Sequence, residues 1–542
     1  MTNLPKLPTG IQTFEEIRTD GYLYVDKTNY LVDLIDRGKV YFLSRPRRFG
    51  KSVTISTLDA LFSGRRELFT GLHAEEFFDR PGYKVHPVVR LDMSDVATDE
   101  GVKALRASLL GQVQENAARL GVDVGTRASG DALSKLIKLA AQTHGSKVVV
   151  LVDEYDKPIL DNMHDPKKAG RFRDVLRNFY VRIKACDAYV HFVFLTGISK
   201  FAKMGVFSAL NNLVDISMDE RYAAMLGYTE EELLSYFDGH IGATADRLGK
   251  SRESLVAEIR DYYDGFSFDG TTMLYNPFST LRFFTHTAFR NYWFESGTPS
   301  FIARYMRDRK LTVEEFRGME VSLDFASFPG EIESSTAASF LYQSGYLSLR
   351  PARYYDYSLD YPNHEVLTAM SGLLTKNLLG EKAAIGSGVF MRKYLLKGDV
   401  DGVVRQFNQL LAAIPYDDYD AAAKVAAQLE DLPMGPREWL YRSTLYSFLL
   451  GIGLDVDAEK HTSKGRSDMV VTFENRVWVI EIKVATAGED VAKEADKAFQ
   501  QIIDKGYAER YPDAVLVGVA IDDERRAIGE YRSNVQCTMY NV

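Results

Sequence analysis

Cysteine is almost absent from this chain of 542 residues, which contains only Cys186 and Cys537. Two cysteines so far apart in the sequence exclude a disulfide framework, and no Cys/His cluster has the spacing of a zinc site. Sparse cysteine of this kind is typical of proteins in a reducing cytosol. We therefore expect a cytoplasmic protein.

Long hydrophobic runs are also missing. A membrane-spanning helix needs about 20 mostly apolar residues, whereas the longest apolar stretches here, such as residues 148–152, have the length of a β-strand. The first residues, MTNLPKLPTG, lack both the charged and the apolar region of a signal peptide. The sequence therefore predicts neither a membrane protein nor a secreted one.

Positive charge is not in excess, because the formal net charge of the chain is -9. A protein of this charge can still bind nucleic acid, but only through a local basic patch. The hydrophobic fraction of 46% and the charged fraction of 26% are ordinary for a soluble globular protein. The length exceeds what one hydrophobic core can hold, which favours several domains.

The first part of the chain alternates short apolar strands with helices. Strands are predicted at residues 40–43, 88–92, 148–153 and 189–196, and helices at residues 52–62, 101–119, 131–143 and 169–185. Apolar strands that alternate with helices predict a parallel sheet covered on both faces, so the fold class is α/β.

Two changes of pattern divide the rest of the chain. Residues 229–425 are mostly helical in pattern, and LPMGP at residues 432–436 marks a boundary because proline and glycine interrupt regular structure. Beyond it the pattern predicts a helix, two adjacent strands, another helix and a last strand at residues 514–521. We expect three domains, over residues 1–228, 229–430 and 431–542.

The stretch FLSRPRRFGKS, residues 42–52, ends like a phosphate-binding loop. Gly50 allows close approach of the backbone, Lys51 supplies positive charge for phosphate, and the Ser52 hydroxyl suits Mg²⁺. The glycine that usually opens such a loop is replaced by arginine. Taken alone, the motif is also compatible with a basic, solvated turn. The residues expected to hold the cofactor from this loop are Arg45, Pro46, Arg47, Arg48, Phe49, Gly50, Lys51 and Ser52.

A second motif, VVVLVDEYDK at residues 148–157, favours a nucleotide site. It predicts a buried strand that ends in Asp153 and Glu154, and the carboxyl ends of parallel strands are where ligands bind. Asp153 would belong to the Mg²⁺ shell, and Glu154 would activate the attacking water. Thr196, at the end of the next predicted strand, could sense the γ-phosphate of ATP or simply end that strand.

The third motif, GRSDMVVTFENRVWVIEIKV, lies at residues 465–484. Alternate residues of a strand share a face, so Glu481 and Lys483 are neighbours. If Glu474 and Asn475 form a two-residue turn, the paired positions place Asp468 opposite Glu481. Asp468 and Glu481 would then bind one or two Mg²⁺ or Mn²⁺ ions for phosphodiester cleavage, with Lys483 stabilising developing charge. The same pattern is also compatible with a charged hairpin on the protein surface.

Glu438 strengthens the interpretation of the third motif. It precedes Leu445 by seven residues in a helix whose apolar positions follow the helical period, so it points to the buried side. A carboxylate that faces the core needs a reason, and metal coordination is one.

These motifs resemble those of the bacterial AAA-ATPase-like family. The resemblance is carried by RPRRFGKS, VDEYDKP, FSALNNLVDIS, GYTEEEL and YNPFS, and it covers nearly the whole chain. In that family the arginine-rich loop without a leading glycine is the usual form. The resemblance implies a P-loop NTPase domain that binds ATP, a helical lid or linker, and a C-terminal restriction-endonuclease-like α/β domain of the PD-(D/E)XK nuclease superfamily.

The resemblance also implies further site residues. Gln501 and Tyr507 match the family's glutamine–tyrosine helix, and Glu459, Gly465 and Arg466 precede Asp468 as family residues do. For FSALNNL and DGFSF we expect a role in structural packing.

Three functions stay open at this point. The first is an ATP-dependent or ATP-gated nuclease that cuts DNA, or less readily RNA. The second is a regulatory NTPase switch whose last domain binds nucleic acid or protein without cutting. The third is a nucleotide-binding scaffold with slow or no hydrolysis. Residues 431–542 contain 14 Lys and Arg against 19 Asp and Glu, a net charge of -5, so the other domains must supply any basic surface.

A homo-oligomer is possible, because ATPases of this kind often use an arginine from a neighbouring subunit. The candidates for such an arginine are Arg171, Arg173, Arg177 and Arg221.

Overall fold

The computed structural model divides the chain into two compact units. Unit 1 comprises residues 1–296 and 316–365, and unit 2 comprises residues 297–315 and 366–542. The described residues are 4–98, 100–126, 128–163, 165–200, 212–295, 316–322, 325, 337–353, 356–379, 381–413, 435–462, 465–506 and 511–535. The expected division at residues 228 and 430 stays a prediction.

A parallel sheet of five strands forms the centre of unit 1. Its order is β2-β3-β4-β1-β5, and every neighbouring pair is parallel. The strands expected from the apolar runs are present, and the parallel α/β fold is confirmed. The short strand β5 was not predicted, because it has only two residues. The strands are β1 (Val40–Ser44), β2 (Val88–Asp92), β3 (Val148–Asp153), β4 (Val190–Gly197) and β5 (Val214–Asp215).

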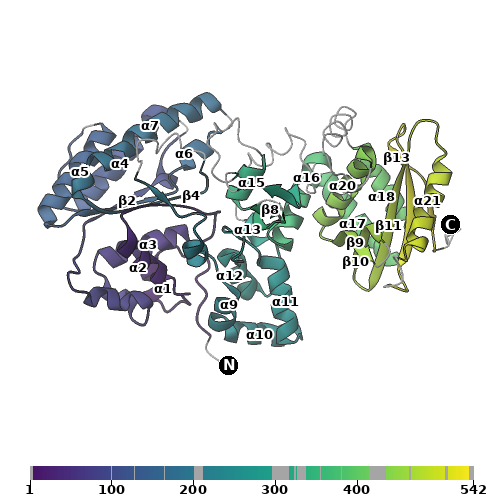
Figure 1. The fold of residues 1–542 in the computed structure, drawn as a ribbon, viewed down its shortest axis with the longest axis horizontal. Coiled ribbons are helices and arrows are strands. Elements are labelled where there is room, and N and C mark those ends of the chain that lie inside the picture. The colour runs from purple at the N-terminus through teal and green to yellow at the C-terminus, as the bar shows by residue number, and fades with distance from the viewer. Residues whose placement is uncertain are drawn as a thin grey trace. The chain divides into compact units, whose positions relative to one another are not determined.

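Helices cover both faces of this sheet (Figure 1). On one side lie α4 (Val102–Arg119), α5 (Ser129–His144) and α7 (Pro166–Ala185), whose apolar positions join the strands in one large core. On the other side lie α1 (Phe14–Thr19), α2 (Thr28–Arg37) and α3 (Lys51–Phe62). Short elements connect these helices: η1 (Arg66–Phe69), η2 (His73–Asp79), η3 (Met93–Asp95), α6 (Lys157–Leu160) and η4 (Asp187–Tyr189).

A second core in unit 1 combines a helical segment with the start of the chain. Leu23 and Val25 pack there with residues of the helices that follow the sheet. Those helices are α9 (Glu230–Tyr236), α10 (Asp238–Leu248), α11 (Arg252–Tyr263), α12 (Pro277–His286) and α13 (Tyr292–Glu295). The short element η5 (Glu220–Met225) precedes them.

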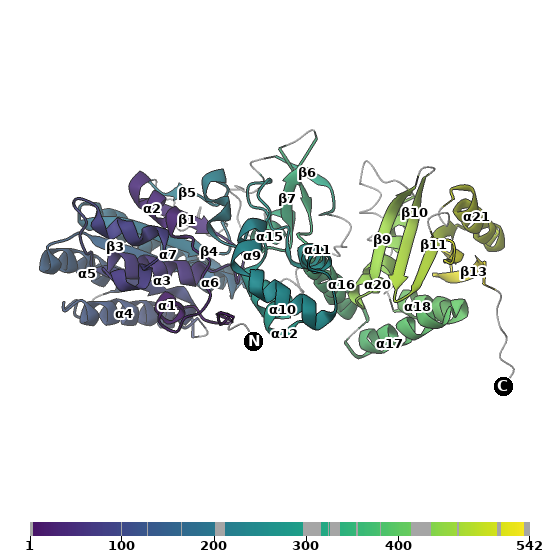
Figure 2. The same cartoon turned by 90° about the horizontal axis from the view of Figure 1, so that it is seen from below.

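The region expected to be mostly helical also contains a small antiparallel sheet (Figure 2). Its strands have only three or four residues, too few to show a periodic pattern. They are β6 (Met319–Val321), β7 (Ser348–Pro351) and β8 (Tyr357–Asp360), in the order β6-β8-β7, and α15 (Ala337–Ser344) precedes β7.

Unit 2 is built around a mixed sheet of five strands in the order β13-β12-β11-β10-β9. Helix α21 (Val491–Asp504) packs on one face, and α17 (Glu381–Lys397) and α18 (Val400–Ala412) pack on the other (Figures 1 and 2). Most of α16 (His364–Leu379) and all of α20 (Pro436–Gly451) complete the unit. The strands are β9 (Asp455–Thr462), β10 (Gly465–Phe473), β11 (Arg476–Ala485), β12 (Val515–Asp522) and β13 (Ala527–Ser533).

The outer strands β9 and β13 were not predicted, since each mixes charged with apolar residues. Among the described residues, no helix combines the length and the apolar character that crossing a bilayer requires.

Candidate functional sites

The loop at residues 45–50 connects β1 to α3, in the order that a phosphate-binding loop needs. Gly50 precedes the helix with a φ of 97°, a left-handed conformation that glycine adopts without strain. Arg48 also has a positive φ, of 65°. The loop therefore turns sharply, and α3 begins with Lys51.

Lys51 is buried, and its amine folds back over the loop. Nζ donates to the carbonyl oxygens of Arg45 and Pro46 at 2.9 and 2.8 Å. Burial lowers the pKa of Lys51, and the nearby carboxylates of Glu154 and Asp153 partly offset that effect. The Lys51 amine therefore lies against the backbone of the loop, close to the carboxylates of Glu154 and Asp153.

Arg45 differs from its predicted role as a cofactor contact. Its guanidinium is buried, with its carbon 4.0 Å from the centre of the Phe268 ring. It donates to the carbonyl oxygens of Ser44, Ser217 and Tyr222 at 2.9, 2.6 and 3.3 Å. Arg45 therefore ties the loop to the segment that follows β5.

Pro46 also points away from the cavity described below. It lies so close to Gly345 that a Cβ at residue 345 would come within 2.6 Å of the proline ring. The cavity is lined by the predicted cofactor contacts Arg47, Arg48, Phe49, Gly50, Lys51, Ser52 and Asp153, and by Glu154, the predicted water-activating residue.

Strand β4 inserts between β1 and β3 and links the acidic pair to the sheet. The Thr196 hydroxyl on β4 donates to Asp153 Oδ1 at 2.7 Å, and the Glu154 backbone N–H donates to the same oxygen at 3.0 Å. Thr196 is fully buried and positions Asp153 instead of lining the cavity. Glu154 has a φ of 50°, and burial raises its pKa while Lys51 opposes the rise. A water-activating carboxylate benefits from such a shift.

These residues border a cavity of about 430 Å³, a volume typical of a small-molecule site. The phosphate-binding loop, Asp153 and Glu154 form its polar side. Apolar and aromatic side chains of the first 25 residues and of the helical segment form a second, apolar wall. That wall includes Leu23, Val25, Tyr228, Phe278 and Leu281. The two walls match a nucleotide, which has charged phosphates at one end and a flat, largely apolar base at the other.

The sequence did not predict several cavity residues. Asp92 ends β2 directly opposite Asp153 of β3, and a carboxylate at the end of a second strand was the signal available for it. Ser94, Lys157 and the first residues of the chain have no comparable signature. The start of the chain contributes Pro8, Gly10, Ile11 and Gln12.

Family motifs without an assigned role shape this cavity. In GYTEEEL, the Thr229 hydroxyl and the Glu232 carboxylate form a capping box at the start of α9, which holds Tyr228 at the cavity wall. In YNPFS, Asn276 caps α12 with Pro277 in its first turn, and Phe278 faces the cavity.

The motif DGFSF packs against the phosphate-binding loop. The rings of Phe266 and Phe268 lie 4.9 and 5.5 Å from the ring of Phe49. Its expected role in packing is therefore confirmed. The motif FSALNNL falls mostly outside the described residues.

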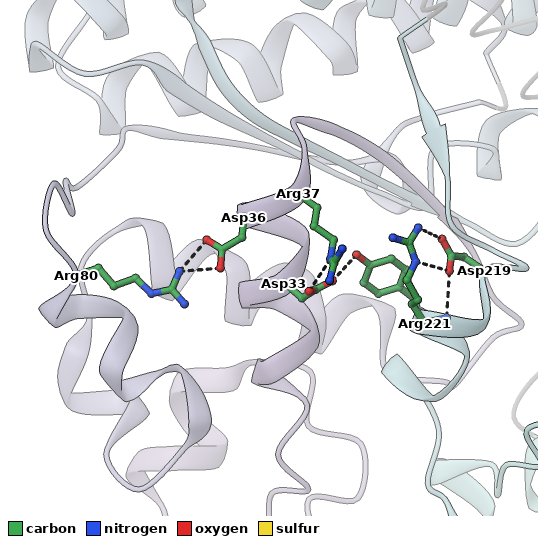
Figure 3. Close-up of polar contacts among 7 residues, drawn as sticks. Asp33, Asp36, Arg37, Arg80, Asp219 and Arg221 are labelled. Atoms are coloured by element: carbon green, nitrogen blue, oxygen red, sulfur yellow. Dashed lines mark hydrogen bonds and ion pairs between the residues drawn. The ribbon is translucent and has the colours of Figure 1, made fainter.

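Arg221, a candidate for the arginine donated between subunits, is paired with a carboxylate of its own chain (Figure 3). It contacts both oxygens of Asp219, with Nε at 2.9 Å from Oδ1. The neighbouring Tyr222 hydroxyl donates to Asp33 of α2 at 2.7 Å, and Asp33 also accepts from Arg37. Arg221 would have to leave a two-point ion pair to reach another subunit.

The third motif, residues 465–484, forms the predicted hairpin; we call it the rear motif and the polar residues around Asp468 and Glu481 the rear cluster. Phe473 pairs with Arg476 and Met469 with Ile480, which confirms the register derived from the sequence. Glu474 has a φ of 53° in the two-residue turn. The pairing of β10 with β11 ends at Met469 and Ile480, and beyond it the Asp468 backbone N–H donates to the Glu481 carboxylate at 3.1 Å.

Asp468 and Glu481 are both buried, with 6% and 1% of their surfaces exposed. Asp468 Oδ2 accepts from the Ile482 backbone N–H at 2.8 Å. Burial raises the pKa of Asp468 to about 6, and burial together with the charge of Asp468 raises the pKa of Glu481 to about 9. Two buried carboxylates whose charges act on each other form a donor set, and a divalent cation would relieve their mutual repulsion.

Two further predicted residues join this pair. Lys483 Nζ lies 2.9 Å from Glu438 Oε1, so the start of α20 reaches the end of β11. The Gln501 amide on α21 donates to Glu481 Oε1. Gly518 of β12 pairs directly with Glu481 and lies under α21, where an added Cβ would come within 2.3 Å of the Phe499 nitrogen. Arg442 of α20, which was not predicted, is buried close enough to lower the pKa of Asp468.

The remaining family positions lie outside the described residues: Tyr507 entirely, and Glu459 and Arg466 in their side chains. Among the described residues, no three His, Cys, Asp or Glu side chains are grouped as a set of metal ligands. The described part of the rear cluster thus offers Asp468 and Glu481 as one pair of oxygen ligands.

Comparison with known proteins places both sites in families. Residues 8–207 match the family of predicted AAA-ATPases, and residues 436–531 match the PD-(D/E)XK nuclease superfamily. The chain is also 38% identical over 542 residues to the "Uncharacterized protein in vnfD 5'region" of Azotobacter chroococcum mcd 1, a match that covers 96% of this chain and 98% of that protein.

A solved structure shows much weaker similarity. It is the "Structure of Drosophila ORC bound to poly(dA/dT) DNA and Cdc6 (conformation 1)", with 12% identity, a TM-score of 0.22 and coverage of 81% of this chain and 70% of that chain. An overlap this weak carries no structural argument. The family matches and the full-length relative do, and this chain therefore belongs to the AAA-ATPase-like family, with a C-terminal domain of the PD-(D/E)XK nuclease superfamily.

Proposed function

We propose that this protein is an ATP-gated, metal-dependent nuclease that cuts DNA, works in the cytoplasm and forms a homo-oligomer. The observation that carries the proposal is the convergence of Asp468, Glu481, Lys483 and Gln501 in unit 2, in a chain whose unit 1 has a nucleotide-sized cavity. A buried pair of carboxylates costs stability, so a domain that keeps one has a use for it.

The front site is the cavity beside the phosphate-binding loop of unit 1. There, ATP would place its phosphates on the loop and its base against the apolar wall. Lys51 would exchange the carbonyls of Arg45 and Pro46 for phosphate oxygens. Ser52 and Asp153 would hold Mg²⁺, which neutralises phosphate charge when bound. Glu154 would orient the attacking water, since it borders the cavity beside Asp153.

At the rear site, Asp468 and Glu481 would hold Mg²⁺ or Mn²⁺, which supplies Lewis acidity and a bound water of lowered pKa. Gln501 orients Glu481 through its hydrogen bond. Lys483 carries the positive charge next to this pair, with Glu438 fixing its amine. The lysine would stabilise the negative charge that develops on the phosphate.

The test compares cleavage of single-stranded and double-stranded DNA, with RNA as a further substrate, by wild type, Lys51→Ala and Asp468→Ala. Cleavage should require Mg²⁺ or Mn²⁺, should disappear in Asp468→Ala, and should lose its response to ATP in Lys51→Ala. Glu474→Gln is the matched control, because it removes an exposed carboxylate from the turn of the same hairpin. Intact substrates under every condition would reject the nuclease.

A regulatory NTPase switch is the second candidate, favoured by the net charge of -5 in residues 431–542, which repels nucleic acid. It predicts phosphate release from ATP by wild type, a large loss in Glu154→Gln, and a biological effect that survives Asp468→Ala. If neither wild type nor Glu154→Gln releases phosphate, both enzymatic candidates fail and a nucleotide-binding scaffold is left.

A further inference from the structure

The helices on one side of the unit 1 sheet carry a large surplus of positive charge. Helix α7 contains seven Lys or Arg residues and one Asp in 20 residues. Helix α4 contains three Lys or Arg and one Glu, and α5 contains two Lys and one Asp. Together these helices have nine more positive than negative residues, although the whole chain has a net charge of -9. We call this surface the basic layer.

Three of the seven positive residues of α7 lie along one edge of the helix. Lys167, Arg171, Asn178 and Arg182 are spaced by four, seven and four residues, which puts them on one side of a helix. Lys167, Arg171 and Arg182 are exposed. The edge from Lys167 to Arg182 is about 22 Å long, at about 1.5 Å per residue.

A groove of about 420 Å³ runs beside this edge, where α7 meets α4 and the start of α5. Its lining includes Arg106 of α4, Ser129 of α5, and Asn178 and Arg182 of α7. Asp131 also lines it and lies 3.2 Å from Arg182. The groove thus combines two guanidinium groups, one carboxylate and polar groups at the start of a helix.

Aromatic rings of the basic layer are turned inward. The phenylalanine and tyrosine rings in α4, α5 and α7, all described in full, are Phe172, Phe179 and Tyr180, and each is buried in the core beneath the helices. Phe179 also borders the groove, and the His144 imidazole at the end of α5 is the one exposed ring of these helices. Proteins that bind single strands stack bases on exposed aromatic rings. A surface with many cations and without exposed Phe, Tyr or Trp rings suits the phosphate backbone of a duplex.

We propose that the basic layer binds the phosphate backbone of duplex DNA, through Arg106, Lys167, Arg171 and Arg182. This inference rests on the proposed function, because it takes DNA as the partner. It locates the positive surface that residues 431–542, with a net charge of -5, do not have. The edge of α7 covers about six base pairs, at about 3.4 Å per base pair along one strand.

The experiment measures binding of a labelled DNA duplex by fluorescence anisotropy over a series of salt concentrations. The full-length protein carries Asp468→Ala and the buffer contains EDTA, so that cleavage plays no part. The test variant adds Arg106→Gln, Lys167→Gln, Arg171→Gln and Arg182→Gln. Its affinity should fall on the order of 10- to 1,000-fold, and the slope of log K against log salt should become shallower by about three to four.

The matched control removes four positive charges from the region of α10 and α11 in the same unit: Arg247→Gln, Lys250→Gln, Arg252→Gln and Arg260→Gln. It should bind the duplex as the parent protein does. Circular dichroism and melting temperature report whether each variant folds. If the fourfold variant does not fold, the double variant Lys167→Glu, Arg171→Glu provides the same comparison.

Other binding outcomes overturn the inference. Unchanged affinity and salt slope in the test variant would do so, as would an equal loss in the control. Loss of ATPase activity without loss of DNA binding would instead assign Arg171 to ATP of a neighbouring subunit. Binding of an acidic polypeptide but not of DNA would assign the surface to a protein. Duplex that is bound but never cut by the protein with Asp468 intact rejects only the nuclease.

Discussion

The arginines of the loop show how neighbouring residues of one type can have different tasks. Arg45 is buried under Phe268 with three backbone carbonyls as acceptors, whereas Arg47 and Arg48 line the cavity. The guanidinium group can donate in several directions within one plane, which lysine cannot do. Arg45 therefore takes the structural position of the missing glycine, and the next two arginines are left for the ligand.

We expect Arg45→Lys to lower the free energy of unfolding of unit 1 by about 2–3 kcal/mol, because buried carbonyls would lose their donors. Denaturant unfolding followed by circular dichroism measures this. Arg47→Ala should leave stability within about 0.5 kcal/mol and weaken nucleotide binding instead. Equal stability of the two variants would contradict the structural role of Arg45.

The raised pKa of Glu481 makes the stability of the metal-free protein depend on pH. Its value of about 9 exceeds the ordinary 4.5, so the folded protein holds a proton that the unfolded chain releases. This stabilising contribution is complete below about pH 4.5 and is lost as the pH rises towards 9. We expect Glu481→Gln to raise the free energy of unfolding by on the order of 2 kcal/mol near pH 8, and by much less near pH 5.

Thermal unfolding in EDTA at the two pH values checks this expectation, with Glu474→Gln as the control of unchanged pH dependence. Millimolar Mg²⁺ should stabilise the wild type near pH 8 and have little effect on Glu481→Gln. A wild type that gains stability between pH 5 and pH 8 in EDTA would refute the assigned protonation.

At the scale of the element, a regular pattern of apolar residues decided which strands and helices could be predicted. The hairpin register followed from the alternation of residues 465–484 and the two-residue turn, and the buried runs predicted strands β1 to β4. Strand β5 and the sheet β6-β8-β7 are too short to show a period. The apolar wall of the cavity joins Val25 to Phe278, and such distant contacts leave no local pattern.

The turn of the hairpin offers a test of that register. Glu474 has a left-handed backbone, which costs a residue with a side chain more than it costs glycine. Glu474→Gly should therefore stabilise unit 2 by about 0.5–1 kcal/mol, measured as a higher midpoint of thermal unfolding. Gly50→Ala is the opposite case, since it puts a side chain at a φ of 97° and should weaken ATP binding. Destabilisation by Glu474→Gly would indicate another turn.

At the scale of the whole molecule, the chain has two units, and each contains one of the two candidate sites. ATP would bind unit 1 and the divalent metal of the rear cluster would bind unit 2. A ligand stabilises the unit that holds it, by about 2.7 kcal/mol at 100 times its dissociation constant. The units should therefore respond independently to their ligands.

Differential scanning calorimetry should show two transitions. ATP with Mg²⁺ should raise one of them, and Lys51→Ala should abolish that response. Mn²⁺ alone should raise the other, and Asp468→Ala should abolish that one. A single transition that shifts with either ligand would show that the units unfold together.

Gly518 gives the rear cluster a requirement that its charged residues do not reveal. Because it pairs with Glu481 and lets α21 approach the sheet closely, it sets how far Gln501 is from that carboxylate. Consider a related chain that has a residue larger than glycine at position 518 but retains Asp468, Glu481, Lys483 and Gln501. That chain would keep every polar group of the cluster and lose their alignment. Among relatives that retain these four residues, the size of the residue at position 518 should therefore separate chains that can align the cluster from chains that cannot.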